Sequence, residues 1–173
     1  MRGLLFPLSG VFLILTGCGS VPKATVTPTQ ATFRMPKVTD INSLNIESDY
    51  PSRATLLPND PKTAIKNVLT MLQAAQPVSV QFPHSKKKLS GESSGYTGPA
   101  TLNLHLNASE DLMITPAYFI WSAWQGGFDY HYVNGVVEYR EDESVIYLRD
   151  VSLYNWLKQD RWKSQFHMPG QNH

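Results

Sequence analysis

The hydrophobic pattern along the chain predicts its clearest helix just after Asn59. Asp60 and Pro61 are residue types that favour the N-cap and the first turn of a helix. Apolar residues then recur at helical spacing and give the element one apolar face: Ile65, Val68, Leu69 and Leu72. Pro77 ends the helix, and residues 78–82 are expected to form a short strand.

The segments that follow alternate between apolar and polar positions, a pattern typical of strands. In residues 101–107 three leucines share one face, and polar side chains that include His105 share the other. Residues 117–124 are apolar on both faces, as expected of a central strand. Gly126 and Gly127 then predict a turn.

Asn134 and Gly135 form the dipeptide that most strongly predicts a two-residue hairpin turn, because both turn positions require positive φ angles. A turn there aligns the flanking strands so that oppositely charged residues pair on one face. The expected pairs are Tyr132 with Val137, Tyr130 with Tyr139, His131 with Glu138, and Asp129 with Arg140. A second turn at residues 141–144 is expected to place Ile146 against Tyr139 and Leu148 against Val137.

A second helix is predicted near the C-terminus, with Ser152 as its N-cap. Its apolar face is expected to contain Leu153, Trp156 and Leu157. Trp162 and Phe166 do not extend this face, so they either pack on a bend of the chain or face a partner. Residues 168–173 are expected to be a frayed tail.

These elements predict an α+β fold with an antiparallel sheet of about five or six strands. One helix precedes the sheet in this prediction, and the C-terminal helix packs on one of its faces. Residues 41–167 form the single predicted domain. Residues 18–40 are rich in threonine and proline, a composition typical of a flexible tether.

Composition supports a folded domain and narrows the class of its partners. Hydrophobic residues make up 42% of the chain and aromatic residues 11%, enough to build a core. The chain has 15 basic and 14 acidic side chains, so its net charge is close to zero. This balance argues against nucleic acid as a partner and against a mainly electrostatic attraction to anionic lipid.

The N-terminal residues 1–17 predict a signal peptide. Arg2 supplies a positive charge, and residues 3–15 form an apolar run that only Pro7 and Ser9 interrupt. A membrane-spanning helix needs about 20 apolar residues, so this run matches the shorter hydrophobic region of a signal peptide. It ends in Leu15-Thr16-Gly17-Cys18, and Cys18 is the only cysteine of the chain.

This four-residue pattern resembles the lipobox of bacterial lipoproteins: an aliphatic residue, a small residue, glycine or alanine, then cysteine. The resemblance implies that diacylglycerol is attached to the sulfur of Cys18 and that the chain is cleaved between Gly17 and Cys18. It also implies a fatty acyl chain such as palmitate on the new amino group. Cysteine suits this chemistry because its thiolate is a strong nucleophile, and several acyl chains together give stable anchoring to the cell membrane.

Gly19 and Ser20 follow the cysteine and bear on where such a lipoprotein is sorted. In enterobacterial lipoproteins an aspartate at the position of Gly19 retains the protein in the inner membrane. The resemblance therefore implies the periplasmic face of the outer membrane, if the host is Gram-negative. In a Gram-positive host this sorting rule does not apply.

Motifs of catalysis and metal binding are weak in this sequence. Residues 85–88 match Ser-x-x-Lys formally, but they lie in a polar loop, where a solvated basic segment is the simpler interpretation. Its lysines are candidates for contact with envelope phosphates: Lys86, Lys87 and Lys88. The five histidines lack the spacing of a metal site. We therefore expect no catalytic residues, no metal and no cofactor.

A group of aromatic residues is the feature with the greatest binding potential. It contains Tyr118, Phe119, Trp121, Trp124, Phe128, Tyr130, Tyr132 and Tyr139. The hairpin register turns most of them inward, so packing in the core is the favoured interpretation, with Trp124 beside the glycine turn as the exception. The candidate binding surface is therefore Trp124, Trp162 and Phe166, together with the three lysines.

The sequence thus predicts a non-enzymatic lipoprotein that is anchored in the cell envelope and presents its domain to the periplasm for binding or assembly. Its expected partners are the membrane, through the acyl chains, and an envelope protein or peptidoglycan. The alternative is a peptidoglycan-directed enzyme or enzyme inhibitor. That alternative requires Asp129, Glu138 and His131 to meet in one deep pocket.

Overall fold

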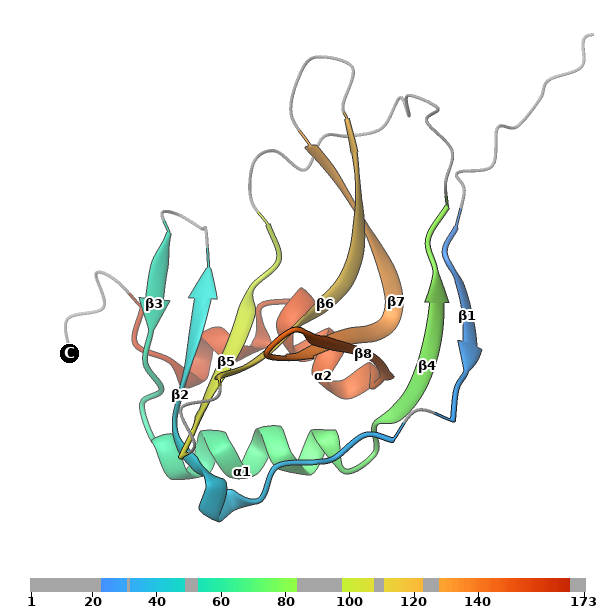
Figure 1. Cartoon of the computed structure of the whole chain (residues 1–173). Helices are drawn as coiled ribbons and strands as arrows, with labels where there is room; N and C mark the ends of the chain where they lie inside the picture. The colour runs from blue at the N-terminus through green and yellow to red at the C-terminus, as the bar shows by residue number, and fades with distance from the viewer. Residues whose placement is uncertain are drawn as a thin grey trace, which may run out of the picture.

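Eight antiparallel strands form a single sheet in the order β1-β4-β8-β7-β6-β5-β2-β3 (Figure 1). The computed structural model describes residues 23–30, 32–48, 53–83, 98–107, 111–122 and 128–168. The strands are β1 (Thr25–Pro28), β2 (Ile41–Ser48), β3 (Ala54–Leu56), β4 (Gln76–Gln81), β5 (Thr101–Leu106), β6 (Asp111–Ser122), β7 (Phe128–Glu141) and β8 (Ser144–Arg149). The helices are α1 (Pro61–Leu72) and α2 (Val151–Lys158), with short 3₁₀ helices η1 (Val38–Asp40) and η2 (Arg161–Gln165).

The fold is mixed α and β, and its sheet is larger than the predicted five or six strands. Three strands precede α1, so the prediction of a helix before the sheet is wrong. No strand was predicted in the segment that contains β2 and β3, because Pro51 and Pro58 interrupt its pattern of apolar and polar residues. Neither described α-helix has the length and hydrophobicity of a membrane-spanning segment.

The structure confirms the helix predicted after Asn59, which is α1. The carboxylate of Asp60 accepts hydrogen bonds from the backbone N–H groups of Lys62 (3.1 Å) and Thr63 (3.3 Å). This capping satisfies two of the donors that the first turn leaves without a helical partner. The buried face of α1 contains the four predicted residues and Ala64.

The helix α2 begins at Val151, and its N-cap is Asp150 rather than the predicted Ser152. Oδ1 of Asp150 accepts a hydrogen bond from the backbone N–H of Leu153 at 2.9 Å. Asp150 directly follows β8 and is buried, and this burial raises the pKa of its carboxyl above the ordinary value. α1 and α2 place their buried faces in one hydrophobic cluster with the inner residues of the sheet.

Much of the predicted tether belongs to the folded domain. β1 is an edge strand that pairs with β4 from Thr25↔Gln81 to Pro28↔Val78. Further along, the ring of Phe33 lies edge-on to that of Tyr139, with 5.0 Å between centroids. The hydroxyl of Tyr139 donates to the carbonyl of Arg34 at 3.2 Å. Only residues before β1 therefore remain as a candidate tether.

The hairpin predicted at Asn134 and Gly135 is not present, because β7 continues through both residues. β6 is long enough to pair with both halves of β7, and residues 133–136 lie opposite Ala117 alone, which makes a wide bulge. Gly135 has φ of +70°, and a Cβ there would lie 3.1 Å from Cγ2 of Val151. The dipeptide supplies the positive φ of a bulge instead of that of a turn.

The second predicted turn is confirmed, and it joins β7 to β8. Tyr139 pairs with Ile146 and Val137 pairs with Leu148, as the alternation predicted. Trp162 in η2 and Phe166 after it are 0% and 1% exposed and belong to the main hydrophobic cluster. They pack on a bend of the chain, which settles the alternative left open by the sequence.

Candidate functional site

A concave notch forms where β6 leaves β5. The two strands pair only from His105↔Asp111 to Leu102↔Ile114, and from Thr115 onward β6 pairs with β7 alone. The bulges at Pro116 in β6 and Gly135 in β7 bend this hairpin away from the rest of the sheet. Among the described residues, the space between the hairpin and the start of β5 is therefore left open.

Two adjoining cavities occupy this space, and we name them together the tyrosine notch. The larger, of about 450 Å³, is lined by Glu47, Arg53, Gly98, Pro99, Thr101, Met113, Thr115, Tyr118, Tyr130, Glu138 and Arg140. The smaller, of about 280 Å³, shares Gly98 and Pro99 and is also lined by Ser48, Ala100, Tyr132, Leu157, Lys158, Asp160 and Lys163.

Three tyrosines line one side of the notch. The ring centroid of Tyr118 lies 5.3 Å from that of Tyr130 and 6.3 Å from that of Tyr132. Burial raises the pKa of Tyr132 to about 12 and also raises the pKa of Tyr118. The hydroxyls of these two tyrosines therefore stay protonated at neutral pH and can both donate and accept hydrogen bonds.

Charged side chains of both signs surround these tyrosines. Nη2 of Arg140 donates to Oε1 of Glu138 at 2.6 Å, and Nζ of Lys163 lies 2.7 Å from Oδ2 of Asp160. Nζ of Lys158 lies 4.1 Å from the centre of the Tyr132 ring, within reach of a cation–π interaction. Such exposed pairs contribute little to stability, and they present both positive and negative groups to the notch.

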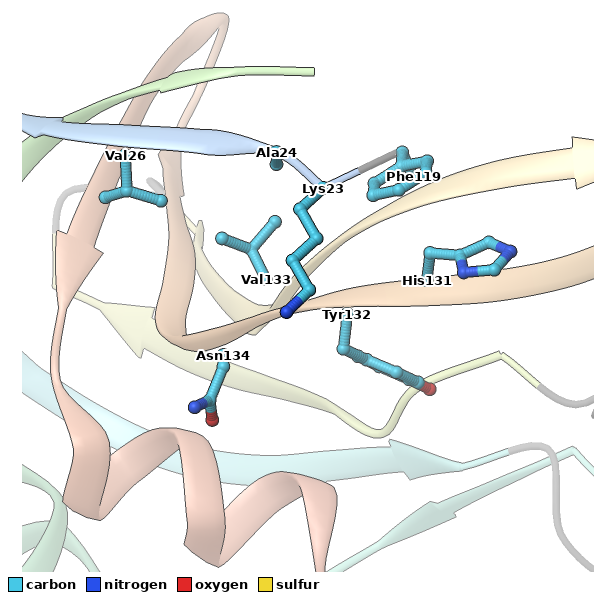
Figure 2. A pocket seen from close by; sticks show the side chains of 8 residues that line it. All are labelled: Lys23, Ala24, Val26, Phe119, His131, Tyr132, Val133 and Asn134. Atoms are coloured by element: carbon cyan, nitrogen blue, oxygen red, sulfur yellow. The ribbon is translucent and has the colours of Figure 1, made fainter. Parts of the chain in front are cut away.

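A separate cavity of about 390 Å³ lies between β1 and the β6–β7 hairpin, and we name it the β1 cavity (Figure 2). Its lining residues are Lys23, Ala24, Val26, Phe119, His131, Tyr132, Val133 and Asn134. In Figure 2 the side chain of Lys23 extends from the start of β1 across the cavity toward β7. The imidazole of His131 stacks on the ring of Phe119, with 5.1 Å between centroids and 17° between planes.

The structure separates the three residues that the enzymatic alternative required. Nε2 of His131 lies 3.0 Å from Oδ2 of Asp129, beside the β1 cavity. Glu138 instead pairs with Arg140 and lines the tyrosine notch. The predicted cross-strand pairs His131–Glu138 and Asp129–Arg140 are therefore wrong, because the bulge in β7 breaks the register on which they depended.

A chain of hydrogen bonds crosses three strands on the sheet face that carries Asn103, buried at Asn103 and exposed at Asp111. Nδ2 of Asn103 donates to Oδ1 of Asn45 at 2.9 Å, and Nδ2 of Asn45 lies 2.7 Å from Nε2 of His105. Nδ1 of His105 lies 2.7 Å from Oδ1 of Asp111. We call these four residues the polar chain.

The direction of the first bond fixes the others. Because Oδ1 of Asn45 accepts, its Nδ2 must donate, so Nε2 of His105 is the acceptor and Nδ1 carries the ring proton. That proton is donated to Asp111. The acceptor nitrogen of His105 is occupied by an amide, which makes a structural role the better explanation than proton abstraction.

The replacement Asn45→Ala is expected to lower the free energy of unfolding by about 1–3 kcal/mol, because it leaves the amide of Asn103 and Nε2 of His105 without their partner. Urea denaturation followed by circular dichroism measures this loss. Ser43→Ala, at an exposed position of the same strand, is the control and should change stability by under about 0.5 kcal/mol. Equal denaturation midpoints for the two variants would contradict the role of the polar chain.

Of the residues predicted to form the binding surface, the structure describes only Trp162 and Phe166. Trp162 and Phe166 are buried in the core, so they do not form a surface. Trp124 and the lysines Lys86, Lys87 and Lys88 lie outside the described residues, as do Cys18, Gly19 and Ser20. The tyrosines 118, 130 and 132, expected mainly in the core, are only partly buried and line the notch.

His105 and His131 lie on different strands and contact different carboxylates, those of Asp111 and Asp129. Among the residues that the structure describes, no three histidine, cysteine or carboxylate side chains cluster in a way that could hold a metal ion. Comparison with protein-family models, with curated proteins and with solved structures finds no match for this chain. The chemistry of the tyrosine notch and of the β1 cavity is therefore the basis for a functional proposal.

Proposed function

We propose that this protein is a non-enzymatic lipoprotein, anchored in the cell envelope through Cys18, whose domain binds or assembles with another envelope component. In a Gram-negative host, Gly19 and Ser20 favour the periplasmic face of the outer membrane. The tyrosine notch is the proposed binding surface. It combines partly buried aromatic rings with hydroxyl donors and charges of both signs, a mixture that suits a protein segment or a peptidoglycan fragment.

The observation that carries this proposal is the position of Cys18 relative to the fold. The lipobox-like sequence Leu15-Thr16-Gly17-Cys18 stands seven positions before Thr25, where β1 starts. Cleavage before Cys18 would remove no part of the described domain. The acylated residue would then lead directly into the sheet through a short segment.

Mass spectrometry of the mature N-terminus tests the anchor. A chain that begins at Cys18 and carries a diacylglycerol thioether and an acylated amino group is the expected result. A mature N-terminus at another residue, or an unmodified Cys18, would overturn the proposal.

Site-specific photo-crosslinking tests the notch as the binding surface. A photoreactive phenylalanine analogue in place of Tyr130 keeps an aromatic ring in the notch, and in intact cells it should form a discrete covalent adduct. The same analogue in place of Lys66, on the exposed side of α1, is the matched control and should give none. Adducts of equal yield at both positions, or at neither, would contradict a binding role for the notch.

A second candidate function, a peptidoglycan-directed enzyme, is favoured by one observation. Asp129 and His131 lie within 3.0 Å of each other beside a cavity that Lys23 also lines, and a carboxylate can orient a histidine for general-base work. Release of soluble fragments from purified peptidoglycan, lost in His131→Ala, would favour the enzyme. No release by the intact protein would favour the binding role.

A further inference from the structure

We propose that the end of the paired strands β6 and β7 that carries Ile120 and Phe128, which we name the hairpin tip, rests in the interfacial layer of the phospholipid bilayer that holds the anchor. The contact is made by the exposed side chains of Ile120 and Phe128. This inference rests on the proposed acylation of Cys18 and adds a second membrane contact, which sets the orientation of the domain.

The apolar side chains of the tip are the first support. Ile120 in β6 is 47% exposed and Phe128 in β7 is 49% exposed. Both share one face of the hairpin with Tyr130, since Ile120 pairs directly with Tyr130 and Phe128 lies two residues before it. Apolar groups beside a tyrosine ring with a polar tip match the composition that proteins present to a membrane interface.

The length of chain between Cys18 and the fold is the second support. Lys23 follows Cys18 by five positions, so even a fully extended segment spans at most about 18 Å. Lys23 lines the β1 cavity together with Phe119 and His131, which form a cross-strand pair of the hairpin. The chain length therefore limits the anchor to about 18 Å from Lys23 at the β1 cavity.

The direction of the hairpin completes the geometry. The pair Ser122↔Phe128 lies three residues beyond the pair Phe119↔His131, a distance of about 10 Å along the strands. In Figure 1 the start of β1 and this end of the hairpin lie toward the top of the view, and α1 lies at the bottom. The tip is therefore on the same side of the domain as the start of β1.

Two apolar side chains are too few to hold a soluble domain on a bilayer, but a tethered domain faces a different requirement. The anchor keeps the tip at high local concentration beside the lipid surface, so a weak contact is enough to select an orientation. The helix α1, at the opposite end of the domain, would then face away from the membrane.

The experiment uses the mature lipidated protein in vesicles of phosphatidylethanolamine and phosphatidylglycerol. Because acylation consumes the sulfur of Cys18, a cysteine introduced by Ser122→Cys is the only thiol that a fluorescent probe can label. Position 122 lies opposite Phe128 and leaves both proposed contacts in place. Glu143→Cys, at the exposed turn between β7 and β8, carries the probe in the control.

With brominated lipids, the emission of the probe at position 122 should fall about twofold, as expected for a group that enters the interfacial layer. The probe at position 143 should be unaffected. Adding Ile120→Ser and Phe128→Ser to the Ser122→Cys protein should abolish the quenching. Both positions are on the surface, and an unchanged circular dichroism spectrum verifies that this variant remains folded.

The outcomes separate the contact from the anchor. If the protein floats with the vesicles but the probes at positions 122 and 143 are quenched equally, the tip contact is overturned and the anchor is left intact. Quenching that survives the two serine replacements would also overturn it. Protein that does not float with vesicles would overturn the anchor, and the tip contact with it. A probe at position 122 that is shielded in intact envelopes but not in vesicles would show that a protein covers the tip instead.

Discussion

Replacement of Trp162 by alanine is expected to lower the free energy of unfolding by about 3–5 kcal/mol. The side chain is fully buried, and its ring meets that of Phe166 edge-on with 6.0 Å between centroids. Its indole N–H has no hydrogen-bond partner among the described residues, so the loss comes from buried area and from the cavity left behind. The short helix η2 has few residues with which to close that cavity.

Thermal unfolding measures this effect, because 1 kcal/mol corresponds to about 2–4 °C in a domain of this size. The melting temperature of Trp162→Ala should therefore fall by roughly 6–20 °C. Val151→Ala, at an exposed position of α2, is the control and should shift it little. A variant with the melting temperature of the unaltered protein would contradict the core position of Trp162 and favour the partner contact that the sequence left open.

Replacement of Cys18 by serine is the second large expected effect, and it concerns location rather than stability. A serine hydroxyl lacks the thiolate that accepts the diacylglycerol, so neither acylation nor the cleavage that follows it should occur. The protein should change from almost wholly membrane-associated and mature to unprocessed or mislocalised. Fractionation of cells followed by immunoblotting measures both changes.

Ser20→Ala is the matched control, because it removes a hydroxyl two positions away and leaves the thiol intact. It should fractionate with the unaltered protein. The same membrane recovery and the same mature mass for Cys18→Ser would contradict the lipid anchor and every inference that depends on it.

The elements that local chemistry determines were predictable from the sequence. The helix α1 has its cap, its proline and its apolar face within one short segment. The leucines of β5 alternate strictly, and the turn between β7 and β8 sits between two alternating runs. In each case neighbouring residues contain all the information that the prediction needs.

The bulge in β7 was not predictable, because its cause is distant in the sequence. Asn134 and Gly135 accept positive φ equally well in a hairpin turn and in a bulge. The deciding factor is that β6 continues past Pro116 and pairs with both halves of β7. A Cβ at position 135 would also be crowded by Cγ2 of Val151 at 3.1 Å. Neither contact can be recognised from the pattern of apolar and polar residues around Asn134 and Gly135.

The tyrosine notch was missed for the same reason. On the hairpin register, Tyr130 and Tyr132 faced the core, whereas the bend at the bulge turns them toward the start of β5. The signal available in the sequence was the cluster of aromatic residues itself, which indicated binding potential without a position. The pairing of Glu138 with Arg140, two residues apart on one strand, is visible only once the register is known.

The edge position of β1 determines how the domain would respond to tension on its N-terminus. Four registered residue pairs hold β1 to β4. Val26 in β1 and Ala24 just before it pack against the smaller hydrophobic cluster rather than the one that contains both helices. Tension on Lys23 would separate β1 from β4 first. The detached strand would then lengthen the segment between the anchor and the rest of the domain. The larger cluster would remain folded, so mechanical load from a moving membrane would be absorbed at the edge of the sheet.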